Sequence, residues 1–295
     1  MLAGIISVQV GAALAARMFG QVTPAVMTGL RLWTAAVVTA ALGAPGLARA
    51  VRSLAAERAW RDAAVVSAFG VTLALMNFSI YQSMARIPLG IAVTVEFLGP
   101  LAVAVASSRR LADLAWVALA GAGVALLSNG WASLSSQRGH AGAGQTLAGI
   151  GFALVAALCW AAYILLSRAT GRRFSGGSGL AIAMVIAALV VTPAVVSGSS
   201  ANGGIARPAV LATGVAAGLL SSVIPYRIEL EALRRIPARI FGIWMSMEPA
   251  VAAFAGLVLL GQSLSLREWA AVGCVMAACA GASRSPAEPS SGPAG

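Results

Sequence analysis

Long apolar runs, separated by short stretches rich in arginine, glycine or proline, make up most of the chain. A helix needs about 20 mainly apolar residues to cross the hydrocarbon core of a bilayer. Runs that meet or approach this length lie at 2–19, 24–44, 63–84, 89–107, 113–130, 146–167, 178–198, 209–232, 237–260 and 266–283. The pattern predicts an all-α membrane protein with ten transmembrane helices joined by short loops. We interpret the first run as a span and not as a removable signal, because it lacks a basic leading segment and many spans follow.

The composition excludes several classes of function. Hydrophobic residues make up 59% of the 295 positions, charged residues make up 10%, and the mean hydropathy is +0.89. Soluble domains are about one quarter charged, so a separate soluble catalytic or nucleic-acid-binding domain is not expected. The net charge is +11, and every basic residue is an arginine, mostly between apolar runs. This charge therefore indicates membrane topology and no nucleic-acid partner.

The arginines are distributed unevenly over the two predicted sides of the membrane. With the N-terminus inside, the inner segments hold 13 arginines and the outer segments hold five. Because cytoplasmic loops collect positive charge, we expect a multi-pass protein of the cytoplasmic membrane with both termini in the cytoplasm. The arginines between positions 49 and 61 are also placed to contact anionic lipid headgroups, although topology alone accounts for them.

Short sequences recur at about half the chain length. At a shift of 149 residues the matches are Arg86-Ile87-Pro88 with Arg235-Ile236-Pro237, Pro100 with Pro249, and Ala104 with Ala253. Each half holds five spans, and an odd number makes the second half enter the membrane inverted, as in many secondary transporters. We therefore expect one five-helix repeat over 1–134, a loop over 135–145, an inverted five-helix repeat over 146–284 and a disordered tail over 285–295.

Two carboxyl groups lie deep inside predicted spans. Glu96 is about eight residues into the fourth span and Glu248 about eleven into the ninth, which at 1.5 Å per residue gives depths of roughly 12 and 16 Å. Both depths are near the midplane of a core about 30 Å thick. Glu96 precedes Pro100 by four residues and Glu248 directly precedes Pro249. Proline-interrupted helices at matching positions of two repeats indicate a transport site.

Ionisable groups inside spans are costly and are therefore candidates for function. Glu96 and Glu248 are expected to take up and release protons or to pair with a substrate ammonium. The alternative is that neighbouring Ser, Thr or Arg groups satisfy each buried carboxyl. Arg31, about seven residues into the second span, suits a substrate carboxylate or neutralises Glu96. Extension of Arg31 toward the outer surface is an equally good interpretation.

Further polar and aromatic residues in the spans are candidates for binding substrate, although interfacial or packing roles are typical of single aromatic residues. They are Asn77, Tyr81, Trp160, Tyr163, Tyr226 and Ser246. Glu229 is another candidate, but its neighbours Arg227 and Glu231 favour mutual pairing.

Patterns typical of enzymes, cofactor sites and metal sites are missing from the sequence. It has no HExxH, GxSxG or P-loop motif, so catalysis is not expected and active transport would use an ion or substrate gradient. The single histidine, His140, has no second ligand type at metal spacing, and the three cysteines lie in apolar runs. We therefore expect neither a metal nor a cofactor.

Motif strings in both halves are more specific than composition. They are Met76-Asn77, Arg86 to Val93, Glu96-Phe97 and Gly99 to Ala104, then Leu220-Ser221-Ser222, Pro225-Tyr226, Phe241-Gly242-Ile243, Met245-Ser246 and Glu248-Pro249-Ala250. In these strings, and over most of its length, the chain resembles the RhtA-type threonine and homoserine exporters, of the EamA group in the drug/metabolite transporter superfamily.

This resemblance implies ten helices in two inverted repeats, a central cavity, and export of small amino acids in exchange for protons. The candidates that fall on matching motif positions are Glu96, Glu248, Asn77 and Ser246. Two positions depart from the family pattern: Gln262 stands where Glu is usual, and Arg227 where a small polar residue is usual. If either position sets specificity or proton coupling, the substrate differs from the one that the family implies.

The leading hypothesis is a secondary exporter that works by alternating access. The alternative within transport is an exporter of drugs or other metabolites. Outside transport the alternative is a membrane scaffold, which has no need of two costly midplane carboxyl groups; a membrane enzyme comes last. The expected partners are a small amino acid, protons and membrane lipid, with no nucleic acid, and a homodimer is left open.

Overall fold

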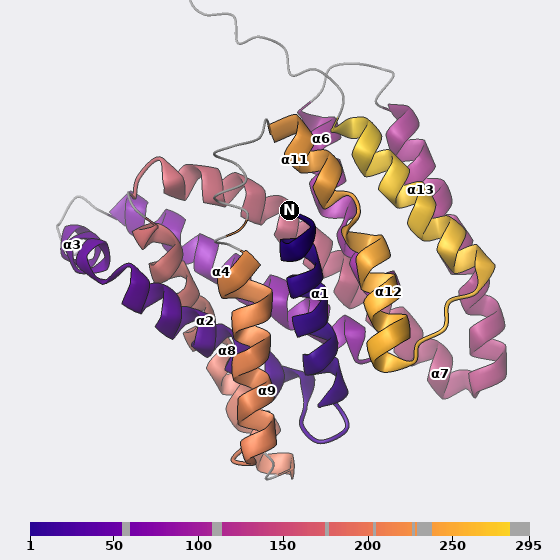
Figure 1. Ribbon diagram of the computed structural model, residues 1–295, viewed down its shortest axis with the longest axis horizontal. Helices are drawn as coiled ribbons and strands as arrows, with labels where there is room; N and C mark the ends of the chain where they lie inside the picture. The colour runs from indigo at the N-terminus through magenta and orange to yellow at the C-terminus, as the bar shows by residue number, and fades with distance from the viewer. Residues whose placement is uncertain are drawn as a thin grey trace, which may run out of the picture.

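The computed structural model describes residues 1–54, 60–107, 114–174, 177–202, 205–225, 228 and 238–283, with side chains for all except 44–45, 53, 127–143, 199–202 and 238–239. Within these residues the chain forms helices and short connections, with no strand (Figure 1), so the predicted all-α class is confirmed. The elements are α1 (Leu2–Arg17), α2 (Pro24–Leu42), α3 (Ala44–Leu54), α4 (Trp60–Met84), α5 (Leu89–Glu96), α6 (Leu98–Ala106), α7 (Leu114–Gly171), α8 (Ser178–Asn202), α9 (Pro208–Gly218), the π-helix η2 (Leu219–Val223), α11 (Ala238–Met245), α12 (Glu248–Leu260) and α13 (Leu266–Ala282).

Seven helical segments in the described part of the chain are long and apolar enough to cross a membrane. They are Leu2–Gly20, Pro24–Leu42, Trp60–Met84, Leu89–Ala106, Gly144–Gly171, Ser178–Gly198 and Ile240–Leu260. Leu114–Leu126 and Pro208–Val223 are shorter apolar helices, and α13 covers the last predicted run. The count of ten spans and the inverted relation of the two halves therefore stay predictions.

The backbone differs from the prediction around the middle of the chain. α7 is helical from Leu114 to Gly171, so the loop expected over 135–145 is wrong as secondary structure. No proline interrupts this stretch to break the helical hydrogen-bond ladder. The two ends of α7 nevertheless pack against different neighbours: Gly123 lies against Ala271 of α13, and Gly149 lies against Ile87 just before α5. One continuous helix thus contains two of the predicted spans.

Two hydrophobic clusters build the interior. One joins α2, α3, α4 and α8 through residues such as Leu32, Phe69 and Met184. The other joins α1, the end of α4, α5, α12 and α13 through residues such as Leu89 and Val275. Large apolar side chains on the outside remain exposed, as expected for a surface in contact with lipid chains; they include Val37, Leu158 and Phe254.

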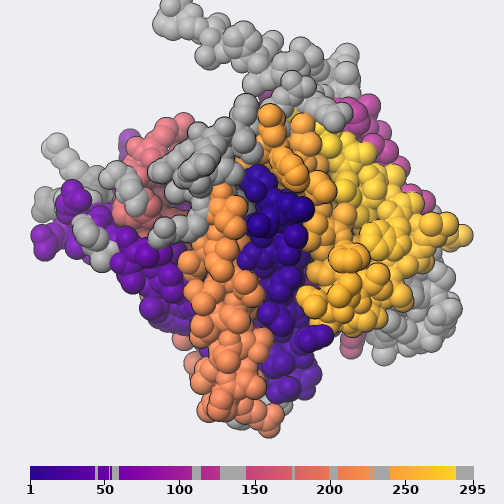
Figure 2. Space-filling view, in the orientation of Figure 1, coloured from indigo at the N-terminus to yellow at the C-terminus, as the bar shows by residue number. Residues whose placement is uncertain are grey.

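Helix α1 lies in the middle of one face of the molecule. Figure 2 shows it in indigo between α9 on one side and α12 with α13 on the other. Small residues allow this packing: a Cβ at Gly11 would overlap the side chains of Leu220 and Ser221 in η2. A second close approach joins α5 to α12, where a Cβ at Gly90 would lie 2.6 Å from Ala253 Cα. Such contacts between small residues are typical of helix pairs in membranes.

Candidate functional site

Two helices are interrupted at the carboxyl groups that the sequence singles out. α5 ends at Glu96 and α6 begins at Leu98, while α11 ends at Met245 and α12 begins at Glu248. Pro100 and Pro249 carry no N–H, so the carbonyl groups four residues before them, on Glu96 and Met245, receive no helical hydrogen bond from them. Both helices thus end and restart within a few residues of these prolines. Unpaired backbone groups at membrane depth are tolerated where they are buried in protein or face a cavity.

A cavity of about 590 Å³ lies beside both interruptions. α1, α2, α4, α5, α6, α7, η2, α11, α12 and α13 all contribute to its wall. The predicted site residues that line it are Arg31, Asn77, Glu96, Pro100, Trp160, Tyr163, Ser246 and Glu248. Tyr81 and Pro249 are buried next to these residues and are not part of the wall, while Tyr226 and Glu229 lie outside the described residues. The structure thus brings eight candidates from both halves of the chain around one space.

Arg31 points into the protein and not to the outer surface. Its Nε donates a hydrogen bond to Ser222 Oγ at 3.3 Å, and its Nη2 donates to the Ser221 carbonyl at 3.1 Å. The guanidinium also lies over the ring of Tyr81, 5.5 Å from its centre. The accepting segment is the π-helix η2, and such short π-helical insertions in a helix occur frequently at functional sites. A cation is therefore held in the cavity wall by backbone, hydroxyl and aromatic groups.

Glu96 faces the same space from the end of α5 and is only 9% exposed. The charge of Arg31 acts on it electrostatically, but the two residues do not form an ion pair within 4.0 Å; in the described part of the chain the ion pair at that range is Arg173 with Asp62. Next to Glu96, the ring of Phe97 packs edge-on against Trp160, with ring centres 4.8 Å apart. Arg31 and Glu96 thus line the same cavity without a direct ion pair between them.

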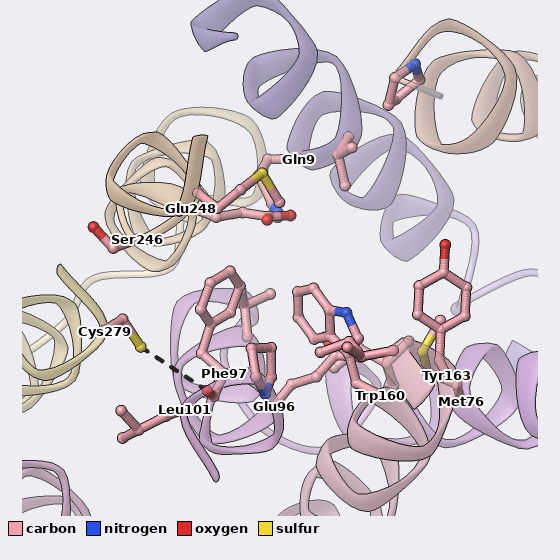
Figure 3. A pocket seen from close by; sticks show the side chains of 18 of the residues that line it. Gln9, Met76, Glu96, Phe97, Leu101, Trp160, Tyr163, Ser246, Glu248 and Cys279 are labelled. Atoms are coloured by element: carbon pink, nitrogen blue, oxygen red, sulfur yellow. Dashed lines mark hydrogen bonds between the residues drawn. The ribbon is translucent and has the colours of Figure 1, made fainter. Parts of the chain in front are cut away.

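Glu248 has a partner that our sequence analysis missed. Gln9 of α1 donates a hydrogen bond from Nε2 to Glu248 Oε1 at 2.9 Å, and both residues are almost fully buried. Figure 3 shows the two side chains meeting on one wall of the cavity, opposite Phe97 and Trp160. The sequence motifs indicated polar residues in other spans, such as Asn77 and Ser246, but not Gln9. An amide in the middle of the first apolar run was the available signal.

The remaining polar candidates are bonded to their own helices. Asn77 Nδ2 donates to the Leu73 carbonyl at 2.8 Å, and Ser246 Oγ donates to the Ile243 carbonyl at 2.7 Å. Cys279, in the opposite wall, points its sulfur at the Phe97 carbonyl at 4.0 Å (Figure 3). No group of three or more His, Cys, Asp or Glu side chains that could hold a metal ion occurs among the described residues.

The cavity extends toward one end of the helix bundle. Its wall includes Arg168 near the end of α7, Ala104 near the end of α6, Ser283 just after α13 and Phe241 near the start of α11. These helix ends lie on the side that the arginine distribution predicts to be cytoplasmic. The wall at this end of the space includes polar groups.

At the opposite end a thin layer separates the cavity from a second pocket of about 410 Å³. Met84 lines both spaces, and Phe19, which lines the outer pocket, contacts the Tyr81 ring edge-on with centres 5.9 Å apart. Hydrogen bonds also join the helices at this end. Arg17 Nε donates to the Leu259 carbonyl at 2.8 Å, and Leu89 N–H donates to Gln262 Oε1 at 2.9 Å.

Comparisons with known proteins agree with these features. The sequence profile of the EamA-like transporter family matches residues 147–284. The threonine/homoserine exporter RhtA of Escherichia coli (strain K12) is 37% identical over 281 residues, which cover 95% of this chain and 89% of that protein. The protein of the same name from Salmonella typhimurium (strain LT2) is 35% identical over the same share of both chains. A solved crystal structure that is 20% identical covers 98% of both chains with a TM-score of 0.54, which shows a shared fold.

Proposed function

Because the chain belongs to the EamA-like transporter family and is of the RhtA type, we propose that it exports small neutral amino acids, with threonine and homoserine as substrates. The observation that carries the proposal is the cavity in which Arg31 faces two carboxyl groups, Glu96 and Glu248. The names of the relatives support the same substrate class.

A zwitterion suits this distribution of charge. The guanidinium of Arg31, held by Ser221 and Ser222, offers donors to the carboxylate of the substrate. Glu96, on the α5 side of the cavity, would receive the ammonium. The cavity volume of about 590 Å³ is in the usual range for small-molecule sites.

Alternating access would explain the difference between the two ends of the cavity. In our proposal the substrate enters from the cytoplasmic end, where Arg168 and Ser283 line the wall, and leaves when the layer at Met84 opens. The two interrupted helices come from matching positions of the proposed inverted repeats, and their contact at Gly90 and Ala253 lies between the halves that would rock. Protons moving inward in exchange would return the protein to its starting state.

A second candidate is export of drugs or other apolar metabolites. It is favoured by the aromatic and aliphatic side chains in the wall, such as Phe97, Trp160 and Phe241. In that case the Arg31 charge would not be needed for export, whereas amino-acid export requires it.

The test is efflux from cells that lack their own exporters and are loaded with threonine, homoserine or a hydrophobic cation. We expect gradient-dependent efflux of the two amino acids, loss of it in Arg31→Gln and Glu96→Gln, and normal efflux in the control Arg173→Gln. Arg173 pairs with Asp62 away from the cavity, so its loss tests for a general effect of removing an arginine. Unchanged amino-acid efflux on expression of the wild type would refute the proposal, and efflux of the cation alone would establish the second candidate.

A further inference from the structure

The amide of Gln9 is only half satisfied. Its Nε2 donates to Glu248 Oε1, but its Oε1 is buried and has no hydrogen-bond partner among the described residues. Buried acceptors are nearly always paired in native proteins, so an orphaned one needs an explanation. Gln9 lies in the middle of α1 and is only 2% exposed. A water molecule at the protein surface therefore does not reach this oxygen and is not the missing donor.

A proton on Glu248 would supply the missing donor. An ionised carboxylate accepts hydrogen bonds only, so it satisfies the N–H of Gln9 and not the carbonyl. A protonated carboxyl group has an O–H, and an amide and a carboxylic acid side by side can exchange two hydrogen bonds. The contact between α1 and α12 therefore gains a hydrogen bond when Glu248 takes up a proton and loses it when the proton leaves.

A ligand ammonium is the competing donor, and burial argues against it. Gln9 Oε1 is covered by protein, although other atoms of the residue line the cavity. A substrate in the cavity does not reach a covered oxygen, whereas a proton on the adjacent carboxyl group does.

We infer that Glu248 carries the exchanged proton and that Gln9 is its positioning residue, while Glu96 and Arg31 serve the substrate. The inference rests on the proposed function and assigns the coupling step to one of its two carboxyl groups. A proton from the aqueous phase binds the Glu248 carboxylate to give the carboxylic acid, and the same O–H bond breaks when the proton is released on the other side.

Helix α1 connects this proton site to Arg31. Ser221 Oγ donates to the Val8 carbonyl, next to Gln9, at 3.2 Å, and Ser7 Oγ donates to the Leu220 carbonyl at 2.7 Å. The Ser221 carbonyl in turn accepts from Arg31. A set of contacts thus runs from Glu248 through α1 and η2 to Arg31, and such packed and hydrogen-bonded connections are one physical route for coupling between two sites.

The other charged or titratable groups around Glu248 are few in the described structure. Those sharing the cavity are Arg31 from α2, Glu96 from α5, Tyr163 and Arg168 from α7, and Cys279 from α13. Arg17 on α1 and Glu268 on α13 lie at the far end of their helices, where they bond to Leu259 and Ser265. Each of these cavity groups lies on a different helix from Glu248, so it can be substituted separately from Glu248.

The experiment compares proton-driven transport with substrate exchange in proteoliposomes. Exchange of labelled for unlabelled threonine cycles through substrate-bound states and needs no net proton movement. We expect Glu248→Gln to lose transport driven by a pH gradient while still catalysing exchange, and Glu96→Gln to lose both. Gln9→Leu should keep exchange but slow pH-driven transport at least tenfold and displace its pH profile by at least one pH unit. The matched control is Glu268→Gln, a buried carboxyl outside the cavity, which should behave as the wild type.

A second readout needs no knowledge of the substrate. Infrared difference spectra across a pH titration should show the C=O band of a protonated carboxyl that disappears in Glu248→Gln, shifts in Gln9→Leu and persists in Glu268→Gln. Normal pH-driven transport in Gln9→Leu, or an unaltered band in Glu248→Gln, overturns the inference. Failure of the wild type to exchange amino acids while the band behaves as expected refutes the substrate and leaves the proton site established.

Discussion

Replacing Arg31 with Gln is the sharpest perturbation of the proposed substrate site. Gln can still donate from an amide to the Ser221 carbonyl or the Ser222 hydroxyl, so the contact with η2 is partly kept while the positive charge is lost. The substitution therefore reduces mainly the binding free energy of a substrate carboxylate, which would lie against the guanidinium. The expected result is weaker binding of amino acids in a protein that still folds.

The magnitude follows from the kind of bond that is lost. A hydrogen bond to a charged group contributes about 1.5–3 kcal/mol, and a tenfold change in affinity corresponds to about 1.4 kcal/mol, so KM for threonine should rise roughly 10- to 150-fold. By contrast, Arg173 forms a 2.8 Å ion pair with Asp62, and both side chains are more than one third exposed. Such surface pairs contribute about 0–1 kcal/mol to folding stability, and neither residue lines the cavity, so Arg173→Gln should leave KM for threonine unchanged.

The assay is initial-rate transport by purified protein in liposomes, with threonine and with the amine that lacks its carboxylate. Wild-type protein should prefer threonine, and Arg31→Gln should lose this preference because nothing remains to recognise the carboxylate. An equal loss for both compounds would refute the reasoning, since it would mean that Arg31 supports the fold and not the substrate. So would a wild-type KM in Arg31→Gln.

Three further predictions concern residues around the cavity. Met84→Ala should join the central cavity to the outer pocket and give threonine leak without a pH gradient, measured as passive efflux, whereas Met84→Leu should stay tight. Gly90→Val should destabilise the protein by about 1–3 kcal/mol through overpacking against Ala253, seen as a lower Tm in detergent, while Gly151→Val, with no atom near its Cβ position, should melt like the wild type. Gln262→Leu should cost about 1–3 kcal/mol by leaving the Leu89 N–H unsatisfied, and Gln262→Glu should restore the Tm.

The sequence predicts the helical class and the helix positions well because apolar length is a strong signal in a membrane. The boundaries of α2 and α8 agree with the runs at 24–44 and 178–198 within a few residues. The loop between the fifth and sixth runs was wrong because glycine and serine lower helix propensity only modestly, and neither ends a helix as a proline does. The polar, glycine-rich composition between the two apolar runs therefore predicted a loop where the backbone of α7 is helical.

The candidate site was predictable where charge or proline marked it. Glu96, Glu248 and Arg31 are conspicuous in apolar runs, and the structure places all three around one cavity. Gln9 was missed because an uncharged amide in a span does not stand out from the many polar residues that pack between helices. Its importance follows only from its bond to Glu248, a contact over 239 positions of sequence that no local pattern contains.

The position of Gln262 in the structure indicates what is affected by having Gln there and not the Glu that is usual in the family. Gln262 does not line the central cavity, and it does line the outer pocket. Its Oε1 accepts a hydrogen bond from the first N–H of α5, a role that a carboxylate oxygen also performs at a helix N-terminus and with added favourable charge. The substitution therefore weakens one contact that holds the start of α5 against the segment just after α12, and it leaves unchanged the groups that we propose to bind a zwitterion. Relative to a variant with Glu at this position, the wild type should open its outer side more readily and transport the same amino acids.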